Sequence, residues 1–216
     1  AGREIGHRKN ASMKNVHLLF PCSPLNSKDV DENFEAEYVA AKKAGFDIFL
    51  FDHDRFIKDA EKLQHNVELK EKVPYRAVVI LRSWMLNDRQ YTLLSLAVEK
   101  EGSRMWTSED DYERRHYWPM AYEAYPHLHA ISPRCFWTDG TTFSVKHVKQ
   151  FFHGVPIVVK DHVKSAKGAE NAVFIKNSGD KREVWTVVEN MIKERGPLFE
   201  RGIVFKEHLN IKKDKN

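Results

Sequence analysis

Basic side chains gather in one short stretch of the chain. An apolar run ends on Lys160, and the loop that follows carries Lys164, Ser165 and Lys167 among small residues. Ammonium groups beside free backbone N–H groups can bind a polyphosphate. The same residues also fit a solvated hairpin whose lysines keep an edge strand from aggregating. Because the segment has no Walker-type glycine pattern, the sequence leaves both interpretations open.

Three further residues are candidates for contacts with an anion or a substrate: Arg82, Arg115 and His116. Arg82 directly follows the apolar run 77–81, and ligands gather at the carboxyl ends of parallel strands. An ion pair with a nearby carboxylate would explain Arg82 equally well. His116 stands beside two aromatic residues, so we expect a hydrogen-bonded core or rim histidine in preference to a catalytic base.

The spacing of metal-ligating residues does not indicate a metal site. The eleven histidines include no HExxH pair, and His127 and His129 together supply too few ligands for zinc. Cys22 and Cys135 lie far apart and match no metal or redox spacing. We therefore expect two inert, buried thiols in a reducing compartment and no metal bound by protein ligands alone.

Composition excludes several classes of protein. The chain of 216 residues is 42% hydrophobic, enough for a globular core. Its net charge of +4 arises from interleaved charges without a concentrated basic stripe, so we expect no nucleic-acid partner. Without a long apolar run or a signal-peptide pattern, we expect no membrane partner and a cytoplasmic location. Homo-oligomerisation stays open.

Alternating strand and helix patterns should position the candidate residues. Apolar runs at 16–20, 46–51 and 77–81 alternate with helical periodicity, and a helix is expected from a cap near Asn87 to Gly102. Such alternation predicts an α/β fold with a parallel sheet covered by helices. The polar residues 1–12, which precede Met13, are expected to be a leader or a vector-derived extension.

The residue composition of the sequence changes after Gly102. Tyrosine, tryptophan and proline residues crowd the stretch that follows, which indicates a domain boundary near residue 106. The second domain is expected to contain a helix at 144–153 and a helix that begins at a capping box at Asp180 and ends at Gly196-Pro197, with strands at 157–160, 172–175 and 202–207.

A series of segments, taken in order, resembles the ATP-grasp superfamily and in particular its bacterial R-two-K clade. The segments are Leu18-Leu19-Phe20-Pro21, Glu37-Tyr38 with Ala44-Gly45-Phe46, Leu81-Arg82-Ser83-Trp84-Met85-Leu86, His116-Tyr117-Trp118-Pro119, Val158-Val159-Lys160-Asp161-His162-Val163-Lys164-Ser165 and Gly202-Ile203-Val204-Phe205-Lys206-Glu207. The resemblance covers nearly everything after Met13. It implies a Rossmann-like pre-ATP-grasp domain over residues 13–106 and an incomplete α+β ATP-grasp domain over residues 107–216.

The resemblance also implies a function. ATP and Mg²⁺ would be the cofactors, and the protein would be a bacterial ligase that joins a carboxylate to an amine through an acyl phosphate, acting on an amino acid or peptide. Lys160 would contact the nucleotide phosphates, while Lys164, Ser165 and Lys167 would belong to the loop that closes over them. Since a buried ammonium without a neutralising phosphate is costly, Lys160 should be accessible when the site is empty.

The residues implied for the adenine end of the nucleotide site depart from the family pattern at one position. Lys206 stands where sequences of the family tend to have arginine, and Glu207 and Leu209 would line the adenine edge. Lysine lacks the planar fork of arginine, which weakens the case for tight phosphate binding at this position. A surface charge at the end of a strand is the alternative role for Lys206.

ATP-grasp enzymes usually place their magnesium ligands beyond the adenine edge, and this sequence ends soon after Glu207. We therefore expect the metal half of the site to be missing, through truncation, through a naturally short chain, or because a second chain completes it. Phosphoryl transfer depends on a bound cation. A non-catalytic ATP-grasp-like binding or interaction module thus stays open beside the ligase.

Overall fold

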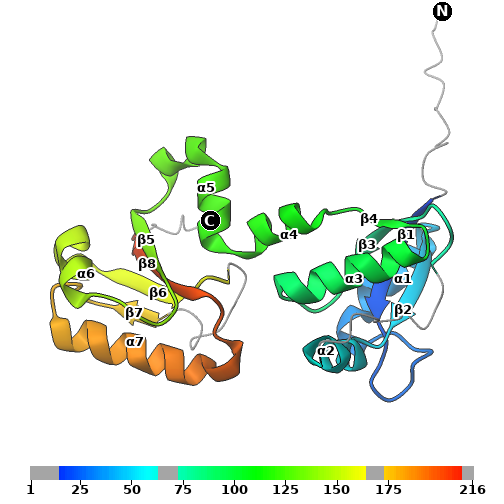
Figure 1. Ribbon diagram of the computed structural model, residues 1–216, viewed down its shortest axis with the longest axis horizontal. Helices are drawn as coiled ribbons and strands as arrows, with labels where there is room; N and C mark the ends of the chain where they lie inside the picture. Colours follow the sequence, from blue (N-terminus) through cyan, green and yellow to red (C-terminus); the bar gives the residue numbers. More distant parts are fainter. Residues whose placement is uncertain (1–14, 63–72, 164–172, 211–216) are drawn as a thin grey trace, which may run out of the picture. The chain divides into compact units, whose positions relative to one another are not determined.

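The computed structural model describes residues 15–62, 73–163 and 173–210, and the chain divides into two compact units (Figure 1). The first unit is Ala1–Tyr112 and the second is Glu113–Asn216. The division falls inside helix α4 (Glu109–His116), a few residues after the boundary expected near residue 106.

The first unit contains a sheet in which every neighbouring pair of strands is parallel, as the alternating pattern predicts. The strands are β1 (Val16–Pro21), β2 (Asp47–Phe51), β3 (Val78–Leu81) and β4 (Arg104–Met105), in the order β2-β1-β3-β4. Strands of such a sheet are covered on both faces, which explains why they read as continuous apolar runs. Arg82 follows β3, so it lies at the carboxyl edge as expected.

Helices cover both faces of this first sheet. They are α1 (Glu35–Lys43), preceded by the short 3-10 helix η1 (Glu32–Phe34), α2 (His53–Glu61) and α3 (Asp88–Lys100). Phe20 and Ala41 are buried together on the α1 side, whereas Leu19 and Leu94 are buried on the side of α2 and α3. α3 begins at the predicted cap, because Asn87 and Gln90 form a reciprocal capping box.

The second unit contains an antiparallel sheet with the order β5-β8-β6-β7. Its strands are β5 (Cys135–Asp139), β6 (Ile157–Asp161), β7 (Val173–Ile175) and β8 (Gly202–Glu207). β5 was not predicted, because its five residues lie in the aromatic-rich stretch that we interpreted only as a boundary. The expected strands at 157–160, 172–175 and 202–207 are confirmed.

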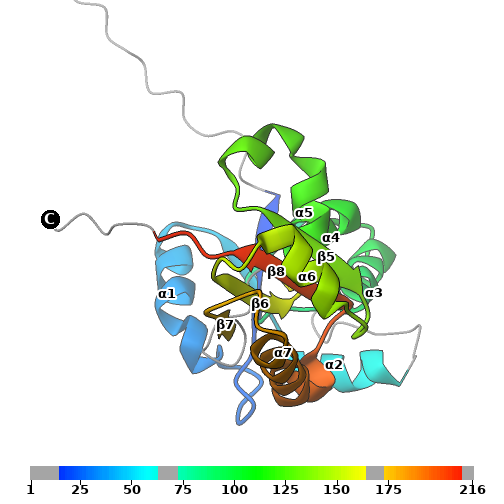
Figure 2. The same ribbon diagram turned by 90° about the vertical axis from the view of Figure 1, so that its left-hand side faces the viewer.

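Two helices of the second unit lie on one side of its sheet, and the aromatic-rich segment lies on the other (Figures 1 and 2). The helices of this unit are α5 (Trp118–Ala124), η2 (Pro126–Ile131), α6 (Val145–Phe152), α7 (Lys181–Arg195) and η3 (Gly196–Leu198). Val148, Phe152, Val184 and Val188 of α6 and α7 are fully buried against Phe205 of β8. Among the described helices, none is long and apolar enough to cross a membrane.

The cap of α7 differs in one detail from the predicted capping box. The Asp180 carboxylate accepts hydrogen bonds from the backbone N–H groups of Arg182 and Glu183, as expected. The Glu183 carboxylate, however, accepts from the backbone N–H groups of Lys176 and Asn177 and not from that of Asp180. The Asp180 N–H instead donates to the Asn177 carbonyl. This bond within the preceding turn replaces the one that a capping box would form between the Asp180 N–H and the Glu183 side chain.

A buried ion pair joins β6 to α7. The Asp161 side chain is fully buried, and both Nε and Nη2 of Arg195 donate to its Oδ2 atom, at 2.9 and 2.6 Å. Nη2 of Arg195 also donates to the Leu198 carbonyl at 2.6 Å. Two charges withdrawn from water in this way are tolerated only while both are present.

We expect Arg195→Met to lower the free energy of unfolding by about 3–5 kcal/mol, because the Asp161 carboxylate would stay buried without its countercharge. Arg134→Met is the matched control in the same unit. It removes an ion pair with Glu207 in which the arginine side chain is 47% exposed, and it should cost about 0–1 kcal/mol. Urea unfolding of both variants measures the difference, and equal losses would contradict a special role for the buried pair.

Candidate functional site

Lys160 and Lys206 share one face of the second sheet. In the antiparallel register Lys160 lies opposite Val204, and Val158 lies opposite Lys206. Directly paired residues and residues two positions apart point to the same side of a sheet. By the same rule Cys135 and Trp137 of β5 join this side, since they pair with Lys206 and Val204. We call this side the lysine face.

The opposite side of the sheet is occupied by the hydrophobic core. Ile157, Val159, Ile203 and Phe205 alternate with the residues of the lysine face and are fully buried beneath α6 and α7. This side therefore has no room for a ligand, and only the lysine face can provide a binding surface on the sheet.

Trp118 covers part of the lysine face. The Lys206 ammonium lies 3.4 Å from the centroid of the Trp118 ring, a close cation–π contact. Trp118 is held in place because its backbone N–H donates to the His162 carbonyl at 2.8 Å, and Tyr117 bridges to Val163. The aromatic residue that opens α5 is therefore tied directly to the end of β6, next to Lys160.

Lys160 is only 9% exposed, so the expectation that it is accessible is wrong. Its strand is an inner strand of the sheet, in which Lys160 is paired with Val204 of β8. Burial lowers the pKa of Lys160 below its usual value; neighbouring Asp161 opposes this effect, whereas Lys206 and Arg195 add to it. An anion bound at this face would offset the electrostatic cost of burying Lys160 close to Lys206.

An aromatic cluster extends the lysine face across β5. The rings of Tyr122 and His129 stack at 3.8 Å, and the Tyr122 ring lies 5.8 Å from that of Trp137, edge to face. Burial and a hydrogen bond with Cys135 raise the pKa of Tyr122. The sequence signal for this cluster was the aromatic crowding after Gly102, which we interpreted as a domain boundary instead of as part of a site.

The remaining candidates for the adenine edge do not join the two lysines. By the strand alternation Glu207 belongs to the core side, where its carboxylate accepts a hydrogen bond from Nε of Arg134 at 2.7 Å. Leu209 follows the end of β8 and is 45% exposed. The loop candidates Lys164, Ser165 and Lys167 lie outside the described residues.

Arg82, Arg115 and His116 do not belong to the strands that form the lysine face. Arg82 belongs to the first unit and forms a two-pronged ion pair with Glu37, the alternative that the sequence left open. His116 is buried, 4.0 Å from a Glu200 carboxylate oxygen and edge-on to a tyrosine ring, as expected for a core histidine. Arg115 is exposed in the last turn of α4.

Cysteine and metal-ligating residues add no further site within the described ranges. Cys22 is buried in the first unit and Cys135 is half-buried in the second, and neither forms a disulfide. Across residues 15–62, 73–163 and 173–210, no three His, Cys, Asp or Glu side chains come together in a way that could hold a metal ion.

Comparison with known proteins places the fold. No protein-family model matches the chain, and neither does any curated protein. Among solved structures, D-alanyl-alanine synthetase A from Vibrio cholerae superposes with a TM-score of 0.56 at 12% identity, covering 93% of this chain and 61% of that one. D-alanine–D-alanine ligase from Bacillus anthracis complexed with ATP gives 0.54 at 13% identity, covering 90% and 56%.

A RimK domain ATP-grasp protein from Sphaerobacter thermophilus gives a TM-score of 0.50 at 13% identity, covering 91% of this chain and 65% of that one. This chain thus spans about three fifths of the length of these structures. At such low identities the likeness shows the fold alone. The expected α/β architecture, a Rossmann-like unit followed by an α+β unit of the ATP-grasp type, is confirmed.

We expect Lys160→Met to raise the thermal unfolding midpoint at neutral pH, because it removes a buried charge and keeps the side-chain volume. The gain should shrink as the pH rises from the lowered pKa of Lys160 toward its ordinary value of 10.5. In that window the folded lysine has lost its proton while the unfolded lysine retains it, so the wild type becomes more stable relative to the variant. Differential scanning calorimetry at several pH values measures the gain.

Exposed Lys193→Met is the control for the Lys160 variant and should leave the midpoint nearly unchanged at every pH. A Lys160→Met protein that is less stable than the wild type at neutral pH would contradict the account of a costly buried ammonium.

Proposed function

We propose that the protein binds ATP on the lysine face and is an ATP-dependent carboxylate–amine ligase of the ATP-grasp type. The observation that carries the proposal is the placement of Lys160 and Lys206 together on the face of the second sheet opposite α6 and α7. The fold of that unit, shared with the ATP-bound ligase from Bacillus anthracis, supports it. The finer assignment to the R-two-K clade rests on the sequence resemblance.

The lysine face suits a nucleotide in two respects. Lys160 and Lys206 supply positive charge for phosphate oxygens, and a phosphate would neutralise the charge that makes burial of Lys160 costly. Trp118 supplies a flat ring beside them, on which a base or a second cation can stack. Lys164, Ser165 and Lys167 are proposed to add phosphate contacts from the loop between β6 and β7.

The proposed reaction joins a carboxylate to an amine. A substrate carboxylate oxygen attacks the γ-phosphorus of ATP, which forms an acyl phosphate and releases ADP. The amine nitrogen then attacks the acyl carbon, forms the amide bond and expels inorganic phosphate. In this scheme Lys160 and Lys206 hold and neutralise the transferring phosphates, a role that depends on preorganised charge. The substrate would be an amino acid or a peptide.

Magnesium does not fit the described residues of this face. The two carboxylates closest in sequence to the lysines, Asp161 and Glu207, lie on the core side of the sheet and are bound to Arg195 and Arg134. Neither is available to a cation on the lysine face, so we assign no metal ligand and derive no step through the metal.

The commitment of Asp161 and Glu207 to arginines favours a second candidate. A nucleotide-binding module without turnover would need the cations of the lysine face but no carboxylates beside them. Such a module would act through a partner protein or through the conformation that the nucleotide stabilises.

ATP binding is tested by thermal unfolding with and without ATP. At about one hundred times the dissociation constant, a ligand stabilises the native state by roughly 2.7 kcal/mol, which raises the midpoint measurably. We expect this rise in the wild type and in Lys193→Met, and its loss in Lys160→Met. An equal rise in Lys160→Met would show that ATP does not bind at the lysine face. No rise in the wild type would contradict ATP binding altogether.

Turnover separates the ligase from the binding module. We expect ADP and inorganic phosphate to be released in equal amounts when ATP, Mg²⁺, an amino acid or peptide carboxylate and an amine are all present, and little release when either organic substrate is omitted. Coupled detection of both products over a panel of substrates is the measurement. ATP binding without substrate-dependent release across the panel would favour the module.

A further inference from the structure

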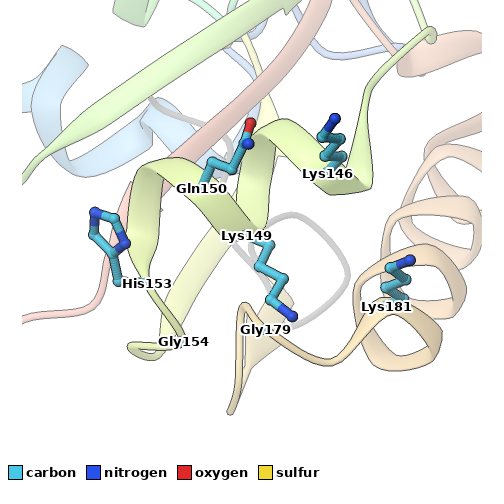
Figure 3. Close-up of a pocket in the computed structure, with 7 residues that line it drawn as sticks. All are labelled: Lys146, Lys149, Gln150, His153, Gly154, Gly179 and Lys181. Atoms are coloured by element: carbon cyan, nitrogen blue, oxygen red, sulfur yellow. The ribbon is translucent and has the colours of Figure 1, made fainter.

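A second basic site lies on the other side of the second unit, away from the lysine face. Helices α6 and α7 flank a pocket of about 760 Å³, within the range of about 300–1,000 Å³ typical of small-molecule sites (Figure 3). Lys146, Lys149, Gln150 and His153 of α6 line it together with Lys181, the first residue of α7. Figure 3 shows Lys149 reaching toward the Gly179 turn that leads into α7, Lys181 on the neighbouring helix, and Lys146 pointing away from Lys149 at the start of α6.

The basic residues of α6 form a regular stripe. Positions 146, 149, 150 and 153 are spaced by three or four residues, so they lie on one face of the helix. The apolar residues Val148 and Phe152 are fully buried on the side that packs against the sheet. Because α6 itself contains no acidic residue, its exposed stripe carries uncompensated positive charge.

The floor of this pocket is held in place by a close contact between two turns. A Cβ atom at Gly179 would lie 3.6 Å from the Gly154 Cα, which shows how closely the end of α6 approaches the turn before α7. The Asn177 side chain fastens this turn, since its Oδ1 accepts from the Gly179 N–H at 2.8 Å. The backbone that carries Lys149 and Lys181 is therefore fixed, although the side chains themselves are exposed.

The lysines of the pocket have no protein countercharge among the described residues. Within these residues the side chains of Lys146, Lys149 and Lys181 form no ion pair and no hydrogen bond. The carboxylates of the adjoining turn are used elsewhere: Asp180 caps α7, and Glu183 binds the backbone N–H groups that precede it. Three lysines thus line one concavity, and their combined positive charge favours a bound polyanion.

We propose that the α6–α7 pocket binds a small molecule with two or more linked phosphate groups, at a site separate from the nucleotide site proposed above. Lysine binds phosphate as a point charge, whereas a planar carboxylate is bound best by the bidentate guanidinium group of arginine. The described lining supplies three lysines and no arginine, and its volume exceeds that of one phosphate group. The ligand is a free oligophosphate or the polyphosphate of a nucleotide.

Isothermal titration of the full chain with tripolyphosphate, without magnesium, tests the proposal. The pocket variant combines Lys146→Ala, Lys149→Ala and Lys181→Ala. Since each exposed charge pair contributes modestly, we expect the three substitutions together to weaken binding by about tenfold or more. The matched control removes the same charge from exposed lysines elsewhere, through Lys28→Ala, Lys58→Ala and Lys193→Ala, and should change affinity by less than about twofold.

Lys160→Met separates this site from the lysine face. Tripolyphosphate binding that persists in Lys160→Met but weakens in the pocket variant supports the proposal, whatever becomes of ATP binding at the lysine face. Binding lost in Lys160→Met and kept in the pocket variant would overturn it. Equal loss in the pocket variant and in the control, or no binding by the wild type, would overturn it as well.

Two further titrants identify the ligand class. In Lys160→Met, ATP that binds more tightly than tripolyphosphate would point to a nucleotide, and equal affinities would point to a free oligophosphate. Hexaglutamate serves as the acidic-peptide probe. Tighter binding of hexaglutamate than of tripolyphosphate, with the same dependence on the pocket lysines, would overturn the assignment to phosphate compounds.

Discussion

The architecture of the second unit depends on the insertion of β8 between β5 and β6. The last strand in sequence becomes an inner strand of the sheet, paired on both sides and antiparallel to both neighbours. This pairing fixes the register that brings Lys206 diagonally beside Lys160, although the two residues lie far apart in the chain. It also requires Gly202 at the start of the strand, because a Cβ atom there would lie 1.9 Å from the Thr138 carbonyl oxygen.

The sheet separates charge in an unusual way. On the core side, Asp161 and Glu207 are each neutralised by an arginine, whereas on the lysine face two cations lie close to each other. Alternation along β6 is the cause, since Lys160 and Asp161 are consecutive and must point to opposite sides. The ion pair with Arg195 neutralises Asp161. Burial of Lys160, in contrast, is unfavourable because its ammonium group is partly desolvated. A buried cation that carries this cost is the kind of group that a bound anion can stabilise.

Much of the fold could be predicted from local patterns. The apolar runs of β1, β2 and β3 and the cap at Asn87 each produced the element expected, because parallel strands and capped helices leave strong local signals. β5 was missed, since its half-buried residues alternate only weakly and stand in an aromatic-rich stretch. The contacts of Trp118 and Tyr122 in the same stretch were also not predicted, because they depend on which strand each ring packs against.

The sequence by itself determined most of the strands and the capped helices and named Lys160 and Lys206 as candidates, because residue type and periodicity are local properties. Only the tertiary structure decided that Lys160 is buried, that Glu207 turns to the core, and that Arg82 pairs with Glu37. These outcomes depend on strand register and on partners distant in sequence, which no local pattern encodes. The α6–α7 pocket arises in the same way, since its lysines belong to helices that packing alone brings together.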